Sequence, residues 1–185
     1  MAINFHIQKS TKLQGVFIIT PNLASDIRGN IYTSFLKEEL EKLLPQGLYF
    51  KHDKFSLSSQ RVLRGIHGDT KSYKFVGCVH GEILQVVVDC RKTSPTYLHY
   101  ESFLINSSAP KFILMPPNMG NAYCVRSKEA LYHYKLAYEG EYLDAPEQFS
   151  LAYNDERIGI DWGIDDPILS SRDRQSLTST QKEKK

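Results

Sequence analysis

The 185-residue sequence lacks the features that mark membrane and secreted proteins. No run comes near the roughly 18 apolar residues of a spanning helix, and the start, MAINFHIQKS, has no apolar core typical of a secretory signal. The three cysteines, Cys78, Cys90 and Cys124, form no CxxC pair, so neither a zinc ribbon nor a disulfide framework is indicated. No membrane partner and a reduced, cytoplasmic setting are therefore expected.

An excess of one charge and the common cofactor motifs are also missing. The 23 basic and 21 acidic residues give a net charge of +2, which provides no reason to expect a nucleic-acid partner. The six histidines form no HxH pair on a strand, so a three-histidine metal centre is not predicted. There is no P-loop, GxGxxG or GxSxG motif.

Aromatic residues, by contrast, are plentiful. Eleven tyrosines and nine phenylalanines against three methionines favour strands. Turn residues recur about every 8–12 positions, and no long helix separates the β-type runs, which predicts an antiparallel sandwich or barrel. The predicted strands are residues 14–19, 48–52, 60–67, 73–79, 82–90, 97–105, 111–115, 121–126 and 130–138.

The connections carry their own signals. His80-Gly81, between two predicted strands, is a two-residue hairpin signal, and residues 26–30 are typical of a turn. Residues 34–44 carry leucines at three- and four-residue spacing, which predicts an amphipathic helix beginning near Thr33 or Ser34.

The C-terminal part has a looser pattern. The sequence is loop-rich after about residue 139, and the polar segment 174–185 is expected to be a flexible tail. We expect one domain over residues 1–185.

Residues 61–74 carry the clearest chemical signal. His67 follows a glycine at the end of an apolar run, Arg64 precedes it, and Lys74 opens the next run. Such a group can bind an anion and move a proton, or it can be a strand-end histidine beside surface cations. Strict alternation places Arg64 and His67 on opposite faces, unless a bulge at Gly65 brings them together.

Two further segments offer partners for such a site. Tyr132 and Tyr134 share one face of the predicted strand 130–138. They can be core residues, or one of them can act as a general acid through its phenol. Asp173, near the end of the chain, can orient a histidine or cap a turn or helix.

The ordered set of these segments resembles the dTDP-4-dehydrorhamnose 3,5-epimerases. The resemblance covers about residues 15–173 and implies an all-β cupin-type jelly roll (a double-stranded β-helix) with a short N-terminal helix and C-terminal loops or helix. It also implies a homodimer that needs no cofactor or metal. The matching segments are residues 26–29, 50–53, 62–67, 74, 80–82, 88–91, 116–117, 134–135, 158–162 and 169–173.

The resemblance also implies roles for single residues. His67 matches the catalytic base, Tyr134 the acid on the opposite face of the sugar, and Lys74 the cation beside the enolate. Asp173 matches the residue that orients the base, with Asp89 as the alternative. Arg28 and Arg64 match positions that hold the substrate and its diphosphate, and Asp89 is a further candidate for substrate binding.

Three positions depart from the family pattern in the substrate pocket. His52 stands where a glutamine is usual, Asn121 where a histidine is usual, and Gly68-Asp69 where a tyrosine follows the catalytic histidine. The pattern is similar to the branch acting on GDP-linked 4-keto-heptoses in capsule polysaccharide synthesis, which implies such a substrate. The alternatives are dTDP-4-dehydrorhamnose, epimerisation at C3 only, a 3,4-ketoisomerase on a related barrel, and a nucleotide-sugar-binding cupin without activity.

Overall fold

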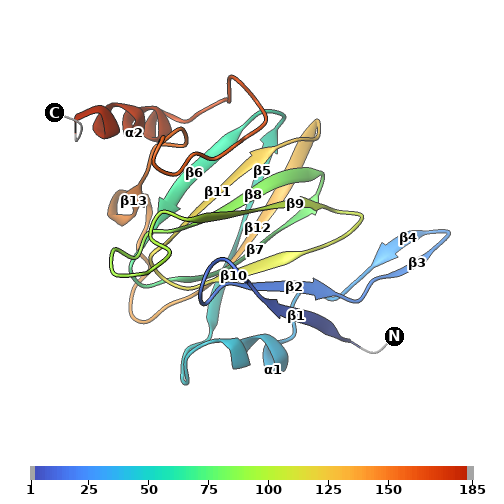
Figure 1. The fold of residues 1–185 in the computed structure, drawn as a ribbon. Coiled ribbons are helices and arrows are strands. Elements are labelled where there is room, and N and C mark those ends of the chain that lie inside the picture. Colours follow the sequence, from blue (N-terminus) through green and yellow to red (C-terminus); the bar gives the residue numbers. More distant parts are fainter. Residues whose placement is uncertain (1–2, 183–185) are drawn as a thin grey trace.

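A computed structural model describes residues 3–182, and two antiparallel β-sheets that face each other form its core (Figure 1). The first sheet has the order β1 (Phe5–Lys9), β2 (Phe17–Pro21), β10 (Phe112–Met115), β7 (Tyr73–His80), β12 (Glu129–Ala137) and β5 (Phe50–Ser59). The second has the order β13 (Phe149–Ser150), β6 (Leu63–Gly68), β11 (Met119–Val125), β8 (Glu82–Asp89) and β9 (Tyr100–Asn106). The predicted antiparallel β-architecture is confirmed.

Three apolar clusters hold these layers together. The central one joins the inner faces of both sheets, with Val76 and Ile113 from the first and Val87 from the second. A second cluster covers the outer face of the second sheet, where Trp162 packs from the C-terminal loops. Because both faces of the central strands are covered, β8 and β11 are buried almost throughout.

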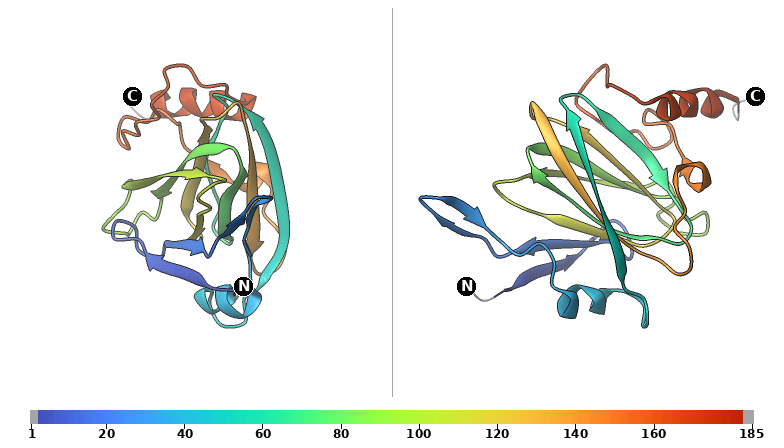
Figure 2. Two further views of the ribbon diagram at one scale, coloured as in Figure 1. Left: turned by 90° about the vertical axis from the view of Figure 1, so that its right-hand side faces the viewer. Right: turned by 180° about the vertical axis from the view of Figure 1, so that it is seen from behind.

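The helices lie at opposite ends of the sandwich (Figures 1 and 2). The one-turn helix α1 (Lys37–Leu40) continues into the 3-10 turn η1 (Glu41–Leu43), and Leu40 packs on the outer face of the first sheet. Helix α2 (Ser171–Lys182) lies beside β6, beyond the short turn η2 (Ala145–Glu147). Among the described residues, no helix has the length and apolarity needed to cross a membrane.

The structure corrects two expected elements. The helix predicted over residues 34–44 begins only at Lys37, and no side chain caps its first turn. The hairpin expected at His80-Gly81 is absent, because β7 and β8 belong to different sheets. Gly81 instead links the two layers at φ +80°, where an added Cβ would lie 2.2 Å from the Glu129 carbonyl oxygen.

Other elements extend or add to the predicted ones. Strand β5 runs seven residues beyond position 52, and a separate hairpin is formed by β3 (Ala24–Asp26) and β4 (Gly29–Ile31), with the predicted turn between them. The segment expected to be a tail is helical as far as Lys182, whereas residues 183–185 lie outside the described part of the chain.

Candidate active site

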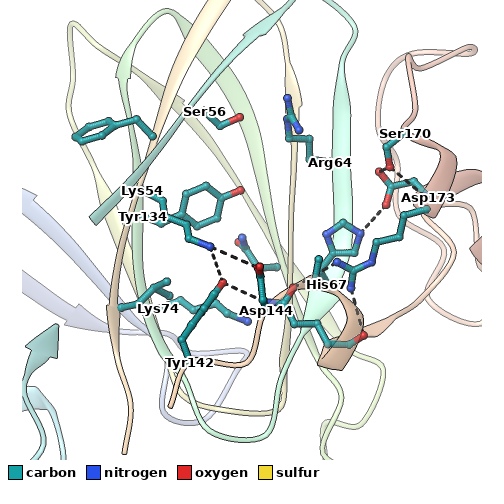
Figure 3. A pocket seen from close by; sticks show the side chains of 16 residues that line it. Lys54, Ser56, Arg64, His67, Lys74, Tyr134, Tyr142, Asp144, Ser170 and Asp173 are labelled. Atoms are coloured by element: carbon teal, nitrogen blue, oxygen red, sulfur yellow. Dashed lines mark hydrogen bonds and ion pairs between the residues drawn. The ribbon is translucent and has the colours of Figure 1, made fainter. Parts of the chain in front are cut away.

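A cavity of about 390 Å³ lies between the two sheets near the start of α2. Its lining comes from β5, β7 and β12 of the first sheet, from β6 and β11 of the second, and from residues 142–148 and 170–173 (Figure 3). Six of the nine predicted site residues line it, namely Arg64, His67, Lys74, Asn121, Tyr134 and Asp173.

His67 and Asp173 form a hydrogen-bonded pair at one side of the cavity. His67 Nε2 lies 2.5 Å from Asp173 Oδ1, and Ser170 donates to Asp173 Oδ2 at 2.8 Å. Burial alone would raise the pKa of Asp173, but the hydrogen bonds from His67 and Ser170 outweigh it and hold that pKa below its usual range. The buried carboxylate therefore orients His67 and stabilises a positive charge on its ring.

The first turn of α2 explains why Asp173 is in place. Ser170 precedes the helix, and its Oγ accepts a hydrogen bond from the Asp173 backbone N–H at 3.2 Å. This is an N-cap contact of the helix, and the positive end of the helix dipole favours a carboxylate there.

Lys74 is the buried cation of the site. Its Nζ lies 3.0 Å from Asp69 Oδ2, and only 8% of its side chain is exposed. Burial lowers the pKa of Lys74, and the attraction of Asp69 opposes that shift. Asp69 in turn accepts the backbone N–H groups of Lys71 and Ser72, at 2.9 and 2.6 Å, which fixes the carboxylate beneath the amine.

Tyr134 faces the cavity from β12, on the side opposite His67 (Figure 3). Its ring packs edge-on against Tyr132, with centroids 4.5 Å apart. Burial raises the pKa of Tyr134 well above its usual range, so the phenol keeps its proton at neutral pH. The predicted parity is confirmed, because His133 and Lys135 both contact Asp53 on the other face.

A bulge in β6 brings Arg64 and His67 to the same cavity. Arg64 lies opposite Tyr123 and His67 opposite Asn121, so β6 has one residue more than β11 between the two pairs. Gly65, at φ +132°, allows this bend. The structure therefore confirms the bulge that the sequence left open.

The mouth of the cavity is bordered by residues 142–148, which the sequence did not single out. Lys54 on β5 donates to the Tyr142 hydroxyl at 3.1 Å, and its Nζ lies 3.7 Å from Asp144 Oδ1. Arg172, from the first turn of α2, also lines the cavity and donates to Ser150 Oγ at 2.9 Å. Short polar loops of this kind carry little pattern, so sequence periodicity could not place them.

Two predicted binding residues lie away from the cavity of their own chain. Arg28, on the β3–β4 turn, is 86% exposed and pairs with Asp26. His52 lies behind the lining, where its Nδ1 is 3.0 Å from the Tyr138 hydroxyl and its ring packs on Tyr142. Burial, together with Lys54, lowers the pKa of His52.

The alternative role of Asp89 as the partner of His67 is wrong. Asp89 is fully buried at the end of β8, where Arg91, Ser94 and Thr96 donate to it at 2.6–2.8 Å. These bonds hold the pKa of Asp89 well below its usual range despite burial, which raises it. Asp89 thus stabilises the loop after β8 and is not among the residues that line the cavity, whereas Asp173 pairs with His67.

Known proteins share both the sequence pattern and the fold. The family model of the dTDP-4-dehydrorhamnose 3,5-epimerases matches residues 10–181. The enzyme of that name from Escherichia coli K12 is 31% identical over 175 residues, covering 91% of each chain. A dTDP-4-dehydrorhamnose 3-epimerase from Streptomyces niveus is 30% identical over 168 residues, covering 89% of this chain and 80% of its own.

Solved structures of sugar epimerases share the fold of this chain. The dTDP-6-deoxy-D-glucose-3,5-epimerase of Legionella pneumophila, in complex with dTDP-4-keto-L-rhamnose, matches with a TM-score of 0.84 and 29% identity, covering 93% of this chain and 91% of its own. A 4-keto-6-deoxy sugar epimerase from the novobiocin gene cluster of Streptomyces spheroides matches at 0.85 and 27%, covering 98% and 92%. The cupin-type fold is confirmed, whereas the expected GDP-heptose branch finds no support among these relatives. The chain belongs to the dTDP-4-dehydrorhamnose 3,5-epimerase family and is a nucleotide-sugar epimerase.

Proposed function

We propose that the enzyme is a dTDP-4-dehydrorhamnose 3,5-epimerase, which inverts C3 and C5 of a 4-keto sugar by proton abstraction and reprotonation. One observation carries this proposal: the His67–Asp173 pair faces the protonated Tyr134 across a single cavity that also holds Lys74. A base on one side and an acid on the other are what inversion at carbon requires.

The first step uses His67 as the base. The ketone at C4 acidifies the protons on C3 and C5, and the neutral imidazole of His67 accepts one of them. The electron pair of the broken C–H bond moves to the C4 oxygen and forms an enolate, beside which Lys74 supplies positive charge. Asp173 stabilises the imidazolium that results.

The second step uses Tyr134 as the acid. Its phenol delivers a proton to the opposite face of the carbon, the C4 ketone re-forms, and the centre is inverted. Tyr134 then recovers its proton from water, and His67 releases its own. Each cycle therefore places one solvent proton on each inverted carbon. Arg64 supplies a guanidinium for the diphosphate, to which arginine binds in bidentate fashion.

The dTDP-linked substrate is favoured by the four relatives described above, which are named for dTDP-linked or 4-keto-6-deoxy sugars. The test is incubation in D2O with dTDP- and GDP-linked 4-keto sugars, followed by mass spectrometry. We expect two deuterons on the dTDP-linked substrate, and none with the His67→Asn variant. One deuteron would indicate epimerisation at C3 only, and uptake on the GDP-linked sugar alone would restore the heptose branch. No uptake at all would overturn the epimerase assignment.

We further propose that the enzyme acts as a homodimer in which the β3–β4 hairpin reaches the partner's cavity. The hairpin projects away from both sheets (Figure 2). It carries two exposed apolar side chains, Ile27 and Ile31, beside the exposed Arg28. Apolar groups and a cation on a projecting element are suited to contact a second copy and an anionic ligand.

A further inference from the structure

A chain of hydrogen bonds at the floor of the cavity begins on a backbone carbonyl. Gln85, on β8, is fully buried, and its Nε2 donates to the Val86 carbonyl oxygen at 2.9 Å. A carbonyl oxygen can only accept, so the NH2 group of Gln85 must lie on this side. The orientation of the Gln85 amide is therefore determined by the backbone of its own strand.

The same amide makes two more bonds that agree with this orientation. Tyr132, from the opposite sheet, donates its hydroxyl proton to Gln85 Oε1 at 2.6 Å. Burial raises the pKa of Tyr132 far above its usual range, so this proton stays in place. The second N–H of Gln85 donates to Asn121 Oδ1 at 2.7 Å.

Asn121 is oriented in turn by Gln85. Because its Oδ1 accepts from Gln85, its Nδ2 points the other way. Tyr132 Oη also lies 3.2 Å from Oδ1, but its single proton is used in the shorter contact with Gln85. Among the described residues, nothing accepts a hydrogen bond from Asn121 Nδ2. The residue is 6% exposed and lines the cavity on the strand next to His67.

We propose that Gln85 and Tyr132 are positioning residues that present the NH2 group of Asn121 to the cavity, where it donates to an oxygen of the bound keto sugar. This inference rests on the proposed function for the class of ligand. An amide oriented in this way is a neutral donor at every pH, unlike an imidazole, which changes charge near neutrality. It adds a contact that orients the sugar without competing with His67 for protons.

The test replaces the NH2 group of Gln85, which donates to Asn121, by an oxygen and keeps the shape of the side chain. In Gln85→Glu the carboxylate cannot donate to Asn121, so the Asn121 amide turns and presents its oxygen to the substrate. Loss of one hydrogen bond raises KM for the keto sugar about tenfold or more, with kcat within about threefold of the wild type. Gln60→Glu, the same exchange on the exposed turn before β6, serves as the control and keeps both constants.

A second background isolates the coupling to Asn121. If Gln85 acts through that amide alone, Gln85→Glu adds nothing to the KM of Asn121→Ala. A persisting increase in that background, or an unchanged KM in the single variant, would overturn the proposal. So would a loss confined to kcat, which would place the amide at the reacting oxygen.

Two further measurements test the proposal even if the Gln85→Glu variant does not fold or turnover cannot be measured. Asn121→Asp preserves the acceptor for Gln85 and replaces the donor by a charged carboxylate, so it is expected to raise KM at least as much should Gln85→Glu not fold. Calorimetric Kd values for the dTDP-linked keto sugar in His67→Asn, with and without Gln85→Glu, do not depend on turnover. A roughly tenfold weaker Kd supports the inference, and an equal Kd overturns it, whereas absence of deuterium uptake by the wild type overturns only the proposed function.

Discussion

In the proposed mechanism Asp173 acts through His67, and several contacts hold its carboxylate in place. Its carboxylate accepts from the imidazole and from Ser170, and it lies in the first turn of α2 with 3% of its side chain exposed. The contact at Nε2 fixes the orientation of the imidazole and leaves Nδ1 as the ring nitrogen that can act as the base. The strength of His67 as a base therefore depends on a helix from another part of the chain.

Substitution Asp173→Asn tests this dependence at one atom. The carboxamide has the same shape but cannot stabilise an imidazolium, and a hydrogen bond to a charged group contributes about 1.5–3 kcal/mol. We expect kcat/KM to fall about 10- to 100-fold while thermal unfolding changes little. Steady-state kinetics measures the effect, with Ser170→Ala as the milder control. An unchanged kcat/KM for Asp173→Asn would remove it from the mechanism.

Single residues differ in how well a sequence can place them. The parity of β12 was enough to put Tyr134 on the inner face and His133 on the outer one. No periodicity could choose between Asp89 and Asp173, because the choice depends on loops that close over long separations. The sequence assigned no role to Asp69, because its pairing with Lys74 depends on the turn between them and is seen only in the folded chain.

The bulge in β6 turns the side chains of Arg64 and His67 into the same cavity. Without it, Arg64 and His67 would point to opposite sides of the sheet. An added Cβ at Gly65 would lie 2.3 Å from the Ala122 Cβ, and the φ of +132° is one that other residues avoid. The bulge therefore depends on glycine at this position.

Replacement of Gly65 by alanine is expected to reduce both stability and activity. The steric conflict and the backbone strain together lower the free energy of unfolding by at least about 2 kcal/mol, and the displaced His67 loses most of its activity. Urea unfolding and the deuterium assay measure the two effects. Gly47→Ala is the matched control, since Gly47 has φ +84° and open space around it, and it should lose only about 1 kcal/mol. Equal losses in both variants would contradict the steric argument.

The positions of helices and strands were predictable where the local sequence pattern determines them. They were not predictable where packing against distant segments determines them. Most strands were located within a few residues from their turns and apolar runs. The glycine turn at position 81 carries a hairpin signal, yet the chain crosses there to the other sheet, because β7 and β8 each have partners elsewhere. The leucine spacing in residues 34–44 is shared by a helix and by a short turn whose leucines pack on a sheet.

At the scale of the whole molecule, the proposed dimer predicts that two inactive variants complement each other. Arg28→Ala lacks the cation that would reach the partner's cavity, and His67→Asn lacks the base. A mixed dimer holds one site with both residues intact, so refolding the two variants together should restore about a quarter of wild-type activity. Each variant alone should stay nearly inactive, and sedimentation should give the mass of a dimer. A monomeric mass, or no recovery on mixing, would refute the shared site.

The long-range pairing of the strands has a consequence for how the molecule is made. Asp53 on β5 meets His133 on β12, 80 positions later, and His67 meets Asp173 across 106 positions. Closing such large loops loses chain entropy before any contact forms, so sheets of this kind fold on the scale of milliseconds to seconds. The proton-transfer pair is thus among the most distant contacts the chain must find, and catalytic competence arises only after the strands between have been paired.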